Sequence, residues 1–207
     1  MQSLFSLFNT PIDLAHNFWE PLLEEGDGVI DATCGNGKDS LHLARVLEKK
    51  KDTALLCFDI QEKALENTKK LLQEKMPDFF PSVEFHLGSH EHLFLPKSQK
   101  LKLIVYNLGY LPGGDKSLTT VVRSTLASVQ KALELLSPGG VISLTCYPGH
   151  PEGAKEEKEL ISFTSSLDPK QWNVTSFSWI NRNASPSFIL IQKQQLWVKA
   201  NSEEKTS

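Results

Sequence analysis

The stretch "GVIDATCGNGKDS", residues 28–40, decides the fold of this chain. Its first part, 28–33, has the apolar character of a buried strand, and a helical pattern of apolar residues begins at Lys38. Gly35 and Gly37 lie in the turn between the two, where glycine lets backbone N–H groups approach a ligand closely. The stretch therefore predicts a strand, a ligand-binding turn and a helix in succession.

The rest of the chain repeats this alternation of strand and helix. A helical pattern within 9–27 has Thr10 as its expected N-cap and Pro11 at its first position. Further strands are predicted at 53–60, 82–88, 102–108, 141–147, 172–180 and 186–193, and further helices at 38–50, 61–75, 117–136 and 153–167. This order predicts an α/β fold with a mainly parallel, Rossmann-like sheet of seven strands, an antiparallel C-terminal strand pair and helices on both faces.

Composition limits the classes of protein to consider. The chain has 207 residues, which suits a single domain over 1–193 followed by a polar tail, 194–207, expected to be flexible. No run of about 18 apolar residues is present, so no membrane span is expected. Three widely spaced cysteines, Cys34, Cys57 and Cys146, indicate reduced, buried thiols and hence a cytoplasmic protein. The formal net charge of −3 argues against extensive non-specific binding to nucleic acid.

The ends of the first two strands indicate the ligand. In a parallel sheet, ligands bind beyond the carboxyl ends of the strands, and Asp59 at the second end is placed to bind ribose hydroxyls. A dinucleotide site would have a third glycine where Ser40 stands. The carboxylates of Asp31 and Asp39 would repel a pyrophosphate but suit the ammonium and sulfonium charges of S-adenosylmethionine. We therefore favour S-adenosylmethionine over NAD(P) and over an inert turn.

The third strand ends in "GSHEHL", 88–93, where the adenine of such a ligand would lie. Ser89 and His90 have groups that can form hydrogen bonds to the ring. His86 and His92 raise the alternative of a metal site, but the sequence supplies no clear companion ligands. We therefore expect no metal.

The fourth strand ends in "NLGYLPGGDK", 107–116, across the expected switch point from the first strand. Asn107 has both an acceptor and a donor, and Tyr110 has a flat face that can hold a planar ring. Acceptors at this position would orient an amine toward a methyl donor, and the pattern resembles the (D/N)PPY motif of amino-methyltransferases, with Leu108 and Gly109 replacing the prolines. This favours nitrogen as the methyl acceptor. The alternative is that Asn107 caps the strand and Tyr110 packs.

Other loops at the same edge carry further candidates. Asp115 and Lys116 either contact substrate and phosphate or act as a helix cap and a solvated charge. Tyr147 and His150 follow the fifth strand and can reach the target. His150 either accepts the proton of an ammonium nucleophile or stabilises its loop. Arg182 binds phosphate or is a surface arginine.

Four stretches, "DATCGNGKDS", "NLGYLPGGDK", "YPGHPEG" and "NRNASPSFILIQK", together resemble the YtqB/MnmM-type class I S-adenosylmethionine-dependent methyltransferases, often labelled rRNA methylases. The resemblance runs from Thr10 to about Lys193. Members of that family convert 5-aminomethyluridine at the tRNA wobble position to 5-methylaminomethyluridine. The resemblance implies donor contacts at Asp31, Asn36, Asp59, His90 and Asn107, and substrate contacts around Tyr110, Asp115, Tyr147 and His150.

The residues and the resemblance together predict a tRNA N-methyltransferase. The donor-binding set is Asp31, Thr33, Gly35, Asn36, Gly37, Asp39, Asp59, Gln61, Ser89, His90 and Asn107. The catalytic set is Asn107, Tyr110 and His150, and the substrate-binding set is Tyr110, Asp115, Lys116, Tyr147, His150 and Arg182, with Arg123 as a further phosphate candidate. The expected partner is the anticodon region of tRNA, whose unpaired base can be splayed into a pocket at little cost.

Several alternatives remain open at this stage. They are an rRNA methyltransferase, a small-molecule amine N-methyltransferase (which the negative charge favours), a non-catalytic binding module and an NAD-dependent oxidoreductase. The sequence leaves the oligomeric state open, with a homodimer as one option.

Overall fold

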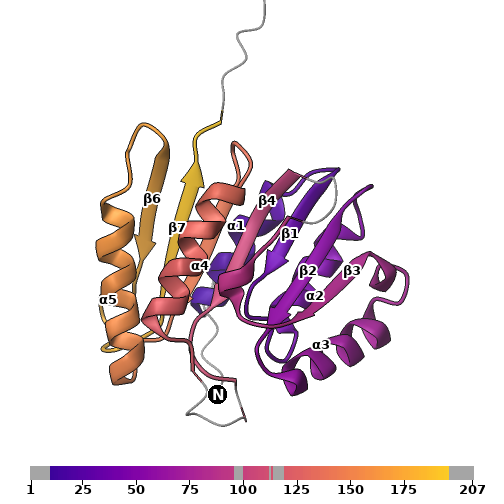
Figure 1. Cartoon of the computed structure of the whole chain (residues 1–207), viewed down its shortest axis with the longest axis horizontal. Helices are drawn as coiled ribbons and strands as arrows, with labels where there is room; N and C mark the ends of the chain where they lie inside the picture. Colours follow the sequence, from indigo (N-terminus) through magenta and orange to yellow (C-terminus); the bar gives the residue numbers. More distant parts are fainter. Residues whose placement is uncertain (1–9, 96–99, 112, 114–118, 196–207) are drawn as a thin grey trace, which may run out of the picture.

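Seven strands form a single sheet in this computed structural model, which describes residues 10–95, 100–111, 113 and 119–195. The strands are β1 (Asp27–Asp31), β2 (Ala54–Asp59), β3 (Val83–Leu87), β4 (Lys100–Asn107), β5 (Val141–Cys146), β6 (Trp172–Phe177) and β7 (Ser187–Lys193). Their order is β3-β2-β1-β4-β5-β7-β6 (Figure 1). Strands β1 to β5 are parallel, and β7 runs antiparallel to both β5 and β6. The predicted mainly parallel sheet with an antiparallel C-terminal pair is confirmed.

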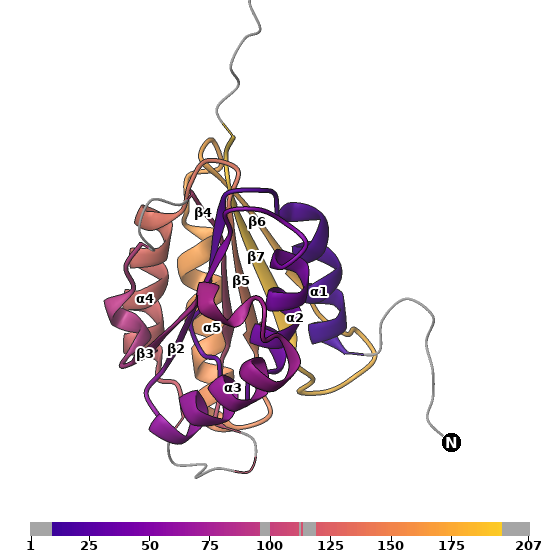
Figure 2. The ribbon, with the colours of Figure 1, turned by 90° about the vertical axis from the view of Figure 1, so that its right-hand side faces the viewer.

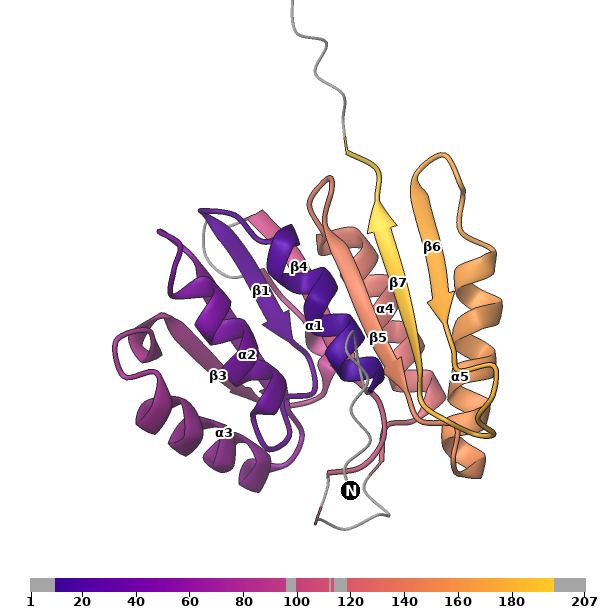
Figure 3. The same cartoon turned by 180° about the vertical axis from the view of Figure 1, so that it is seen from behind.

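Helices cover both faces of the sheet. They are α1 (Pro11–Leu22), α2 (Lys38–Leu47), α3 (Glu62–Lys75), α4 (Val122–Leu135) and α5 (Pro151–Ser165), with short 3₁₀ turns η1 (Phe80–Ser82) and η2 (His90–His92). Figure 1 shows α4 and α5 in front of the sheet, and Figure 3 shows α1, α2 and α3 on the opposite face. Each face has its own hydrophobic cluster, so the sheet is buried on both sides.

The strand order reverses between β1 and β4, because β2 and β3 lie on one side of β1 and β4 and β5 lie on the other. Asp31 at the end of β1 pairs in register with Cys57 of β2 on one side and with Val105 of β4 on the other. The helices that follow the two strands, α2 after β1 and α4 after β4, therefore lie on opposite faces, as the nearly edge-on view in Figure 2 shows. This is the switch point at which α/β proteins bind ligands.

The first helix begins as the sequence predicts. The side chain of Thr10 accepts a hydrogen bond of 3.1 Å from the backbone of Asp13, whose carboxylate accepts one of 2.8 Å from the backbone of Thr10. Together with Pro11 at the first position, this capping box fixes where α1 begins.

The fourth helix begins later than predicted. We expected a helix over 117–136, but α4 begins at Val122. The backbone N–H of Thr120 instead donates a hydrogen bond of 3.0 Å to the carbonyl of Gly109. β-Branched residues such as Thr119 and Thr120 are weak helix formers, and here tertiary bonds hold them in an extended conformation. Residues 114–118 lie outside the described residues.

Candidate active site

Helix α3 packs against the glycine turn, the turn that contains Gly35 and Gly37. Gly35 and Gly37 have φ angles of +51° and +78°, which side chains rarely adopt. A Cβ atom at Gly37 would lie 2.9 Å from the hydroxyl of Thr68, and that hydroxyl donates a hydrogen bond of 3.0 Å to the carbonyl of Gly35. Asn67 of the same helix donates one of 3.0 Å to the side chain of Asn36. The backbone of this turn is thus packed closely against α3.

Asp59 links the turn to the end of β2. One carboxylate oxygen accepts 2.9 Å from the N–H of Gly35, and the other accepts 2.9 Å from the N–H of Gln61. Burial raises the pKa of Asp59 against the lowering effect of these backbone bonds. Asp59 therefore fixes the turn, and Gln61 takes part through its backbone.

Asp31 is a carboxylate buried at the switch point. It is 1% exposed, and its side chain accepts a hydrogen bond of 2.5 Å from the hydroxyl of Ser40. Burial, and next the charge of Asp39, raise the pKa of Asp31 to about 7. Ser40 thus stands where a dinucleotide motif would have its third glycine, and its hydroxyl bonds to Asp31. A cation placed here would favour the ionised carboxylate.

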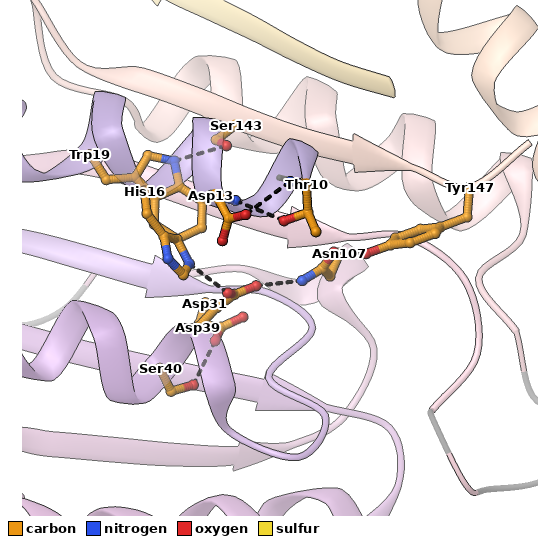
Figure 4. A network of polar contacts seen from close by, with 10 residues as sticks. All are labelled: Thr10, Asp13, His16, Trp19, Asp31, Asp39, Ser40, Asn107, Ser143 and Tyr147. Atoms are coloured by element: carbon orange, nitrogen blue, oxygen red, sulfur yellow. Dashed lines mark hydrogen bonds and ion pairs between the residues drawn. The ribbon is translucent and has the colours of Figure 1, made fainter. Parts of the chain in front are cut away.

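Asp39, in the first turn of α2 after the glycine turn, connects this part of the chain to α1. Its Oδ1 accepts a hydrogen bond of 2.8 Å from Nε2 of His16 (Figure 4). The ring of His16 stacks on that of His42 with 3.8 Å between the centroids. Burial, followed by the charge of His16, lowers the pKa of His42 to about 4. One turn further along α1, Trp19 donates 3.0 Å to the hydroxyl of Ser143 on β5. These contacts fix α1 against the sheet.

Asn107 stands at the centre of a chain of side-chain hydrogen bonds. Its amide donates to Asp39, and its side-chain oxygen accepts 2.9 Å from the hydroxyl of Tyr147 (Figure 4). Its backbone N–H donates 2.7 Å to the hydroxyl of Thr33. Burial, and next Asp39, raise the pKa of Tyr147 to about 12, so this hydroxyl keeps its proton and donates. The orientation of the Asn107 amide is therefore set on both sides.

The ring of His90 is buried beneath α4. It is 7% exposed, and it packs edge-on against Tyr106 at 5.9 Å between centroids. Burial lowers the pKa of His90, which favours the neutral ring. The carbonyl of His90 accepts 2.8 Å from Ser128, while the Ser89 hydroxyl accepts 3.2 Å from the N–H of Glu91. The Ser89 hydroxyl of this predicted adenine site is thus engaged with the protein, whereas Nε2 of the buried His90 ring has no hydrogen-bond partner among the described residues.

His150 caps helix α5. Its Nδ1 accepts a hydrogen bond of 3.1 Å from the backbone N–H of Gly153, and Pro151 occupies the first helical position. A neutral imidazole that accepts at Nδ1 has its proton on Nε2. Here the loop-stabilising alternative describes the contacts of His150. The helix predicted over 153–167 consequently begins two residues earlier, at Pro151.

A buried glutamate braces the loop that follows Asn107. Glu156 of α5 is 3% exposed and accepts 2.8 Å from Thr120 and 2.6 Å from Thr125. The hydroxyl of Thr120 also accepts 2.9 Å from the N–H of Gly109. Burial raises the pKa of Glu156, against the lowering effect of both threonines. The position of Gly109, and of Tyr110 after it, therefore depends on α5.

Comparison with known proteins assigns this chain to a family. The model of a family described as "Putative rRNA methylase" matches residues 55–193. A protein of Arabidopsis thaliana named "tRNA (mnm(5)s(2)U34)-methyltransferase, chloroplastic" is 33% identical over 193 residues, which make up 88% of this chain and 69% of the relative.

The chain belongs to the rRNA methylase family.

Solved structures of the rRNA methylase family support the same assignment. A "putative rRNA-methylase" of Clostridium thermocellum is 32% identical with a TM-score of 0.81, covering 90% of this chain and 98% of that one. A "putative methyltransferase" of Streptococcus mutans, solved in complex with SAH, is 30% identical with a TM-score of 0.76, covering 90% and 99%. This chain is therefore a class I methyltransferase, and an NAD-dependent oxidoreductase is set aside.

The predicted residues at the substrate edge are only partly brought together. The rings of Tyr110 and His150 lie 6.0 Å apart, and Tyr147 reaches Asn107. Arg182, in the loop between β6 and β7, lines the same surface pocket as Tyr147. Asp115 and Lys116 lie outside the described residues. Arg123 is exposed on the first turn of α4.

Two residues of this candidate site were missed from the sequence. His16 was not singled out, because 23 positions separate it from Asp39 and no local pattern joins them. Glu156 had a usable signal, since it lies one helical turn from Leu160 on the face that α5 buries. An acid on an apolar helical face indicates a buried hydrogen-bond network.

Within the described ranges, no group of three or more His, Cys, Asp or Glu side chains is arranged to hold a metal ion. In the same ranges, no helix combines the length and the apolar character needed to cross a membrane. The three cysteines are free and buried, as predicted.

Proposed function

We propose that this protein transfers a methyl group from S-adenosylmethionine to the amine of 5-aminomethyluridine at the wobble position of tRNA. The observation that carries the proposal is the junction of Asp39 in the donor loop with Asn107 at the end of β4. This hydrogen bond joins the loop proposed to hold the methyl donor to the strand end proposed to hold the methyl acceptor. The name of the Arabidopsis relative supports the choice of tRNA.

The residues of the glycine turn fit the donor. Gly35 and Gly37 present backbone without side chains. A cation next to the buried carboxylate of Asp31 would stabilise its ionised form. S-Adenosylmethionine carries an ammonium group, and it supplies an electrophilic methyl group on a sulfonium. Thr33, Asn36, Asp59, Gln61, Ser89 and His90 complete the proposed donor site. Asp59 and the N–H groups it holds would define the position of the ribose.

The chain itself orients the acceptor. Asn107 has a second lone pair on its side-chain oxygen, and the Asp39 and Tyr147 contacts hold that oxygen in one orientation. An amine N–H can bond there while its lone pair forms the new C–N bond as the C–S bond breaks. Orientation and proximity supply most of the rate.

The proton of the amine has to leave before attack. His150 has its Nδ1 engaged in the α5 cap, so we propose water as the proton acceptor. Tyr110, which is 39% exposed, would hold the uracil ring.

The test is methyl transfer from labelled S-adenosylmethionine to tRNA carrying 5-aminomethyluridine, followed by nucleoside mass spectrometry. We expect one added methyl on that nucleoside, and loss of transfer in Asn107→Ala with donor binding retained. Asn173→Ala, an exposed asparagine on the outer strand β6, is the matched control. Wild-type rates in Asn107→Ala would refute the proposed role of Asn107.

A second candidate is methylation of rRNA, which the description of the matching family favours. Running the same assay on ribosomal RNA and on small aliphatic amines separates the three substrate classes. The single domain over 1–193, the cytoplasmic location and the homodimer remain predictions. Size-exclusion chromatography with light scattering tests the last of them.

A further inference from the structure

A surface pocket lies next to the proposed acceptor site. It has a volume of about 240 Å³ and is enclosed by the beginning of α1, by Tyr147 and by the loop between β6 and β7. The residues that matter here are Pro11, Ile12, Tyr147, Trp179, Arg182 and Pro186. Pockets for drug-sized ligands span about 300–1,000 Å³, so this pocket suits a single ring system rather than a complete cofactor.

The pocket contains a preformed pair of a cation and an aromatic ring. The guanidinium of Arg182 lies 4.7 Å from the centroid of the Trp179 indole. Arg182 is exposed, and it forms no ion pair with any carboxylate in the described part of the chain. None of the described carboxylates therefore neutralises its positive charge. Indole and guanidinium planes are surfaces on which nucleobases stack.

Tyr147 is shared by the pocket and by the acceptor site. Its ring lines the pocket, while its hydroxyl donates to Asn107 at 2.9 Å. The ring also lies against Gly109, where a Cβ atom would be 3.8 Å from Tyr147 Cδ2. A ring bound in the pocket would thus be separated from a target at Asn107 by about the breadth of one side chain.

We propose that this pocket, the Trp179 pocket, binds a nucleobase adjacent to the target nucleotide in a single-stranded RNA. The base stacks on the Trp179–Arg182 pair, and the guanidinium neutralises a backbone phosphate. The proposal rests on the proposed function, since it assumes that the target at Asn107 belongs to RNA. It explains how a chain with a net charge of −3 can bind RNA, through stacking with few phosphate contacts.

The test measures RNA binding separately from methyl transfer. A tRNA anticodon stem–loop transcript with an unmodified wobble uridine is titrated into the protein in the presence of S-adenosylhomocysteine. We expect Trp179→Ala to weaken binding by about 5- to 150-fold, and Trp179→Phe to retain most of it. Arg182→Ala should lower the slope of log K against log salt concentration by about one.

A matched control lies at the far end of the same hairpin. There, Lys193 lies 5.4 Å from the centroid of the Trp172 ring, so Lys193→Ala disrupts a similar pair away from the site. This control should leave RNA affinity unchanged. Thermal unfolding of each variant, and binding of S-adenosylhomocysteine, show whether the fold and the donor site persist.

The outcomes separate this proposal from the proposed function. Unchanged RNA affinity in folded Trp179→Ala, or absence of RNA binding by the wild type, would overturn the Trp179 pocket even if tRNA is methylated. Trp179-dependent binding without methyl transfer to 5-aminomethyluridine would support the pocket and overturn the proposed reaction.

Discussion

The hydroxyl of Tyr147, just beyond β5, donates a hydrogen bond of 2.9 Å to the side-chain oxygen of Asn107, at the end of β4. The two strands are parallel neighbours, and Asn107 pairs in register with Thr145. Because parallel neighbours end at the same edge of the sheet, side chains separated by 40 positions meet there. With Asp39 on the amide nitrogen, this contact selects one orientation of the Asn107 amide.

Removing the Tyr147 hydroxyl should slow catalysis without weakening donor binding. In Tyr147→Phe the oxygen of Asn107 loses its protein donor, and the amide is held at one end only. A neutral hydrogen bond contributes about 0.5–1.5 kcal/mol, so we expect kcat to fall by about 2- to 12-fold. Single-turnover methyl transfer and calorimetric titration with S-adenosylhomocysteine check the two halves of this prediction.

Tyr106→Phe is the matched control for that variant. The Tyr106 hydroxyl is also buried and lies 2.8 Å from its partner, the hydroxyl of Ser128, beneath α4. Its loss should lower the free energy of unfolding and leave kcat near the wild-type value. Equal losses of kcat in both variants would contradict a specific role for Tyr147.

Donor binding should release a proton from Asp31. The pKa of Asp31 is raised to about 7 by burial and Asp39, and a cationic donor favours the ionised form. Binding below pH 7 must therefore expel the proton, and affinity should fall by about 20-fold between pH 7.5 and 5.5. Titration calorimetry in two buffers of different ionisation enthalpy measures the proton released. Asp31→Asn should abolish this release.

The same raised pKa has a defined effect on the ligand-free protein. The folded state holds the Asp31 proton more tightly than the unfolded chain does, since its pKa is raised from 3.8 to about 7. The stabilising contribution is therefore complete below pH 4 and is lost as the pH rises through 7. Thermal unfolding should show a smaller loss of stability over this range in Asp31→Asn than in the wild type.

A Cβ atom at Gly37 should displace the glycine turn and weaken donor binding. In Gly37→Ala the new Cβ would lie 2.9 Å from the hydroxyl and 3.0 Å from the Cα of Thr68, at a φ of +78°. We expect donor affinity to fall at least tenfold as the turn shifts away from α3, which corresponds to about 1.4 kcal/mol. Gly26→Ala isolates the conformational part, because Gly26 has a φ of +77° with nothing within 4 Å of its Cβ. Similar donor affinities in the two variants would argue against the Thr68 contact.

Replacing Glu156 should loosen the loop that carries Tyr110. A glutamine at this position has one acceptor oxygen, so the hydroxyl proton of either Thr120 or Thr125 loses its acceptor. We expect the free energy of unfolding to fall by about 1–3 kcal/mol and KM for RNA to rise, with donor affinity unchanged. Glu159→Gln, an exposed site on the same helix, is the control. An unchanged KM in folded Glu156→Gln would show that the hydrogen bonds of Glu156 do not position Tyr110 for substrate binding.

The sequence was sufficient where function follows topology. Asp31, Asp59, Asn107 and Tyr147 each stand at or just beyond a strand end, and a parallel sheet must bring such positions to one edge. The alternation of strands and helices predicted that sheet because apolar periodicity reports burial directly.

The sequence was insufficient where contacts between distant elements decide the structure. The beginning of α4 was misplaced because Glu156 and Gly109 hold Thr120 extended, and local helical pattern carries no trace of these partners. The role of His150 was ambiguous because capping and proton transfer use the same nitrogen atoms. The capping bond itself is visible only in the structure, where the N–H of Gly153 lies 3.1 Å from Nδ1 of His150.

Helix α1 also fixes the spacing between the Trp179 pocket and Asp39. Pro11 and Ile12 line the Trp179 pocket, while His16 of the same helix bonds to Asp39 in the donor loop. Each residue turns an α-helix by about 100° and advances it by about 1.5 Å. A single residue inserted between Ile12 and His16 would therefore rotate His16 off the donor loop while Pro11 kept its place. The number of residues in that turn of helix sets the distance between the pocket and the methyl donor.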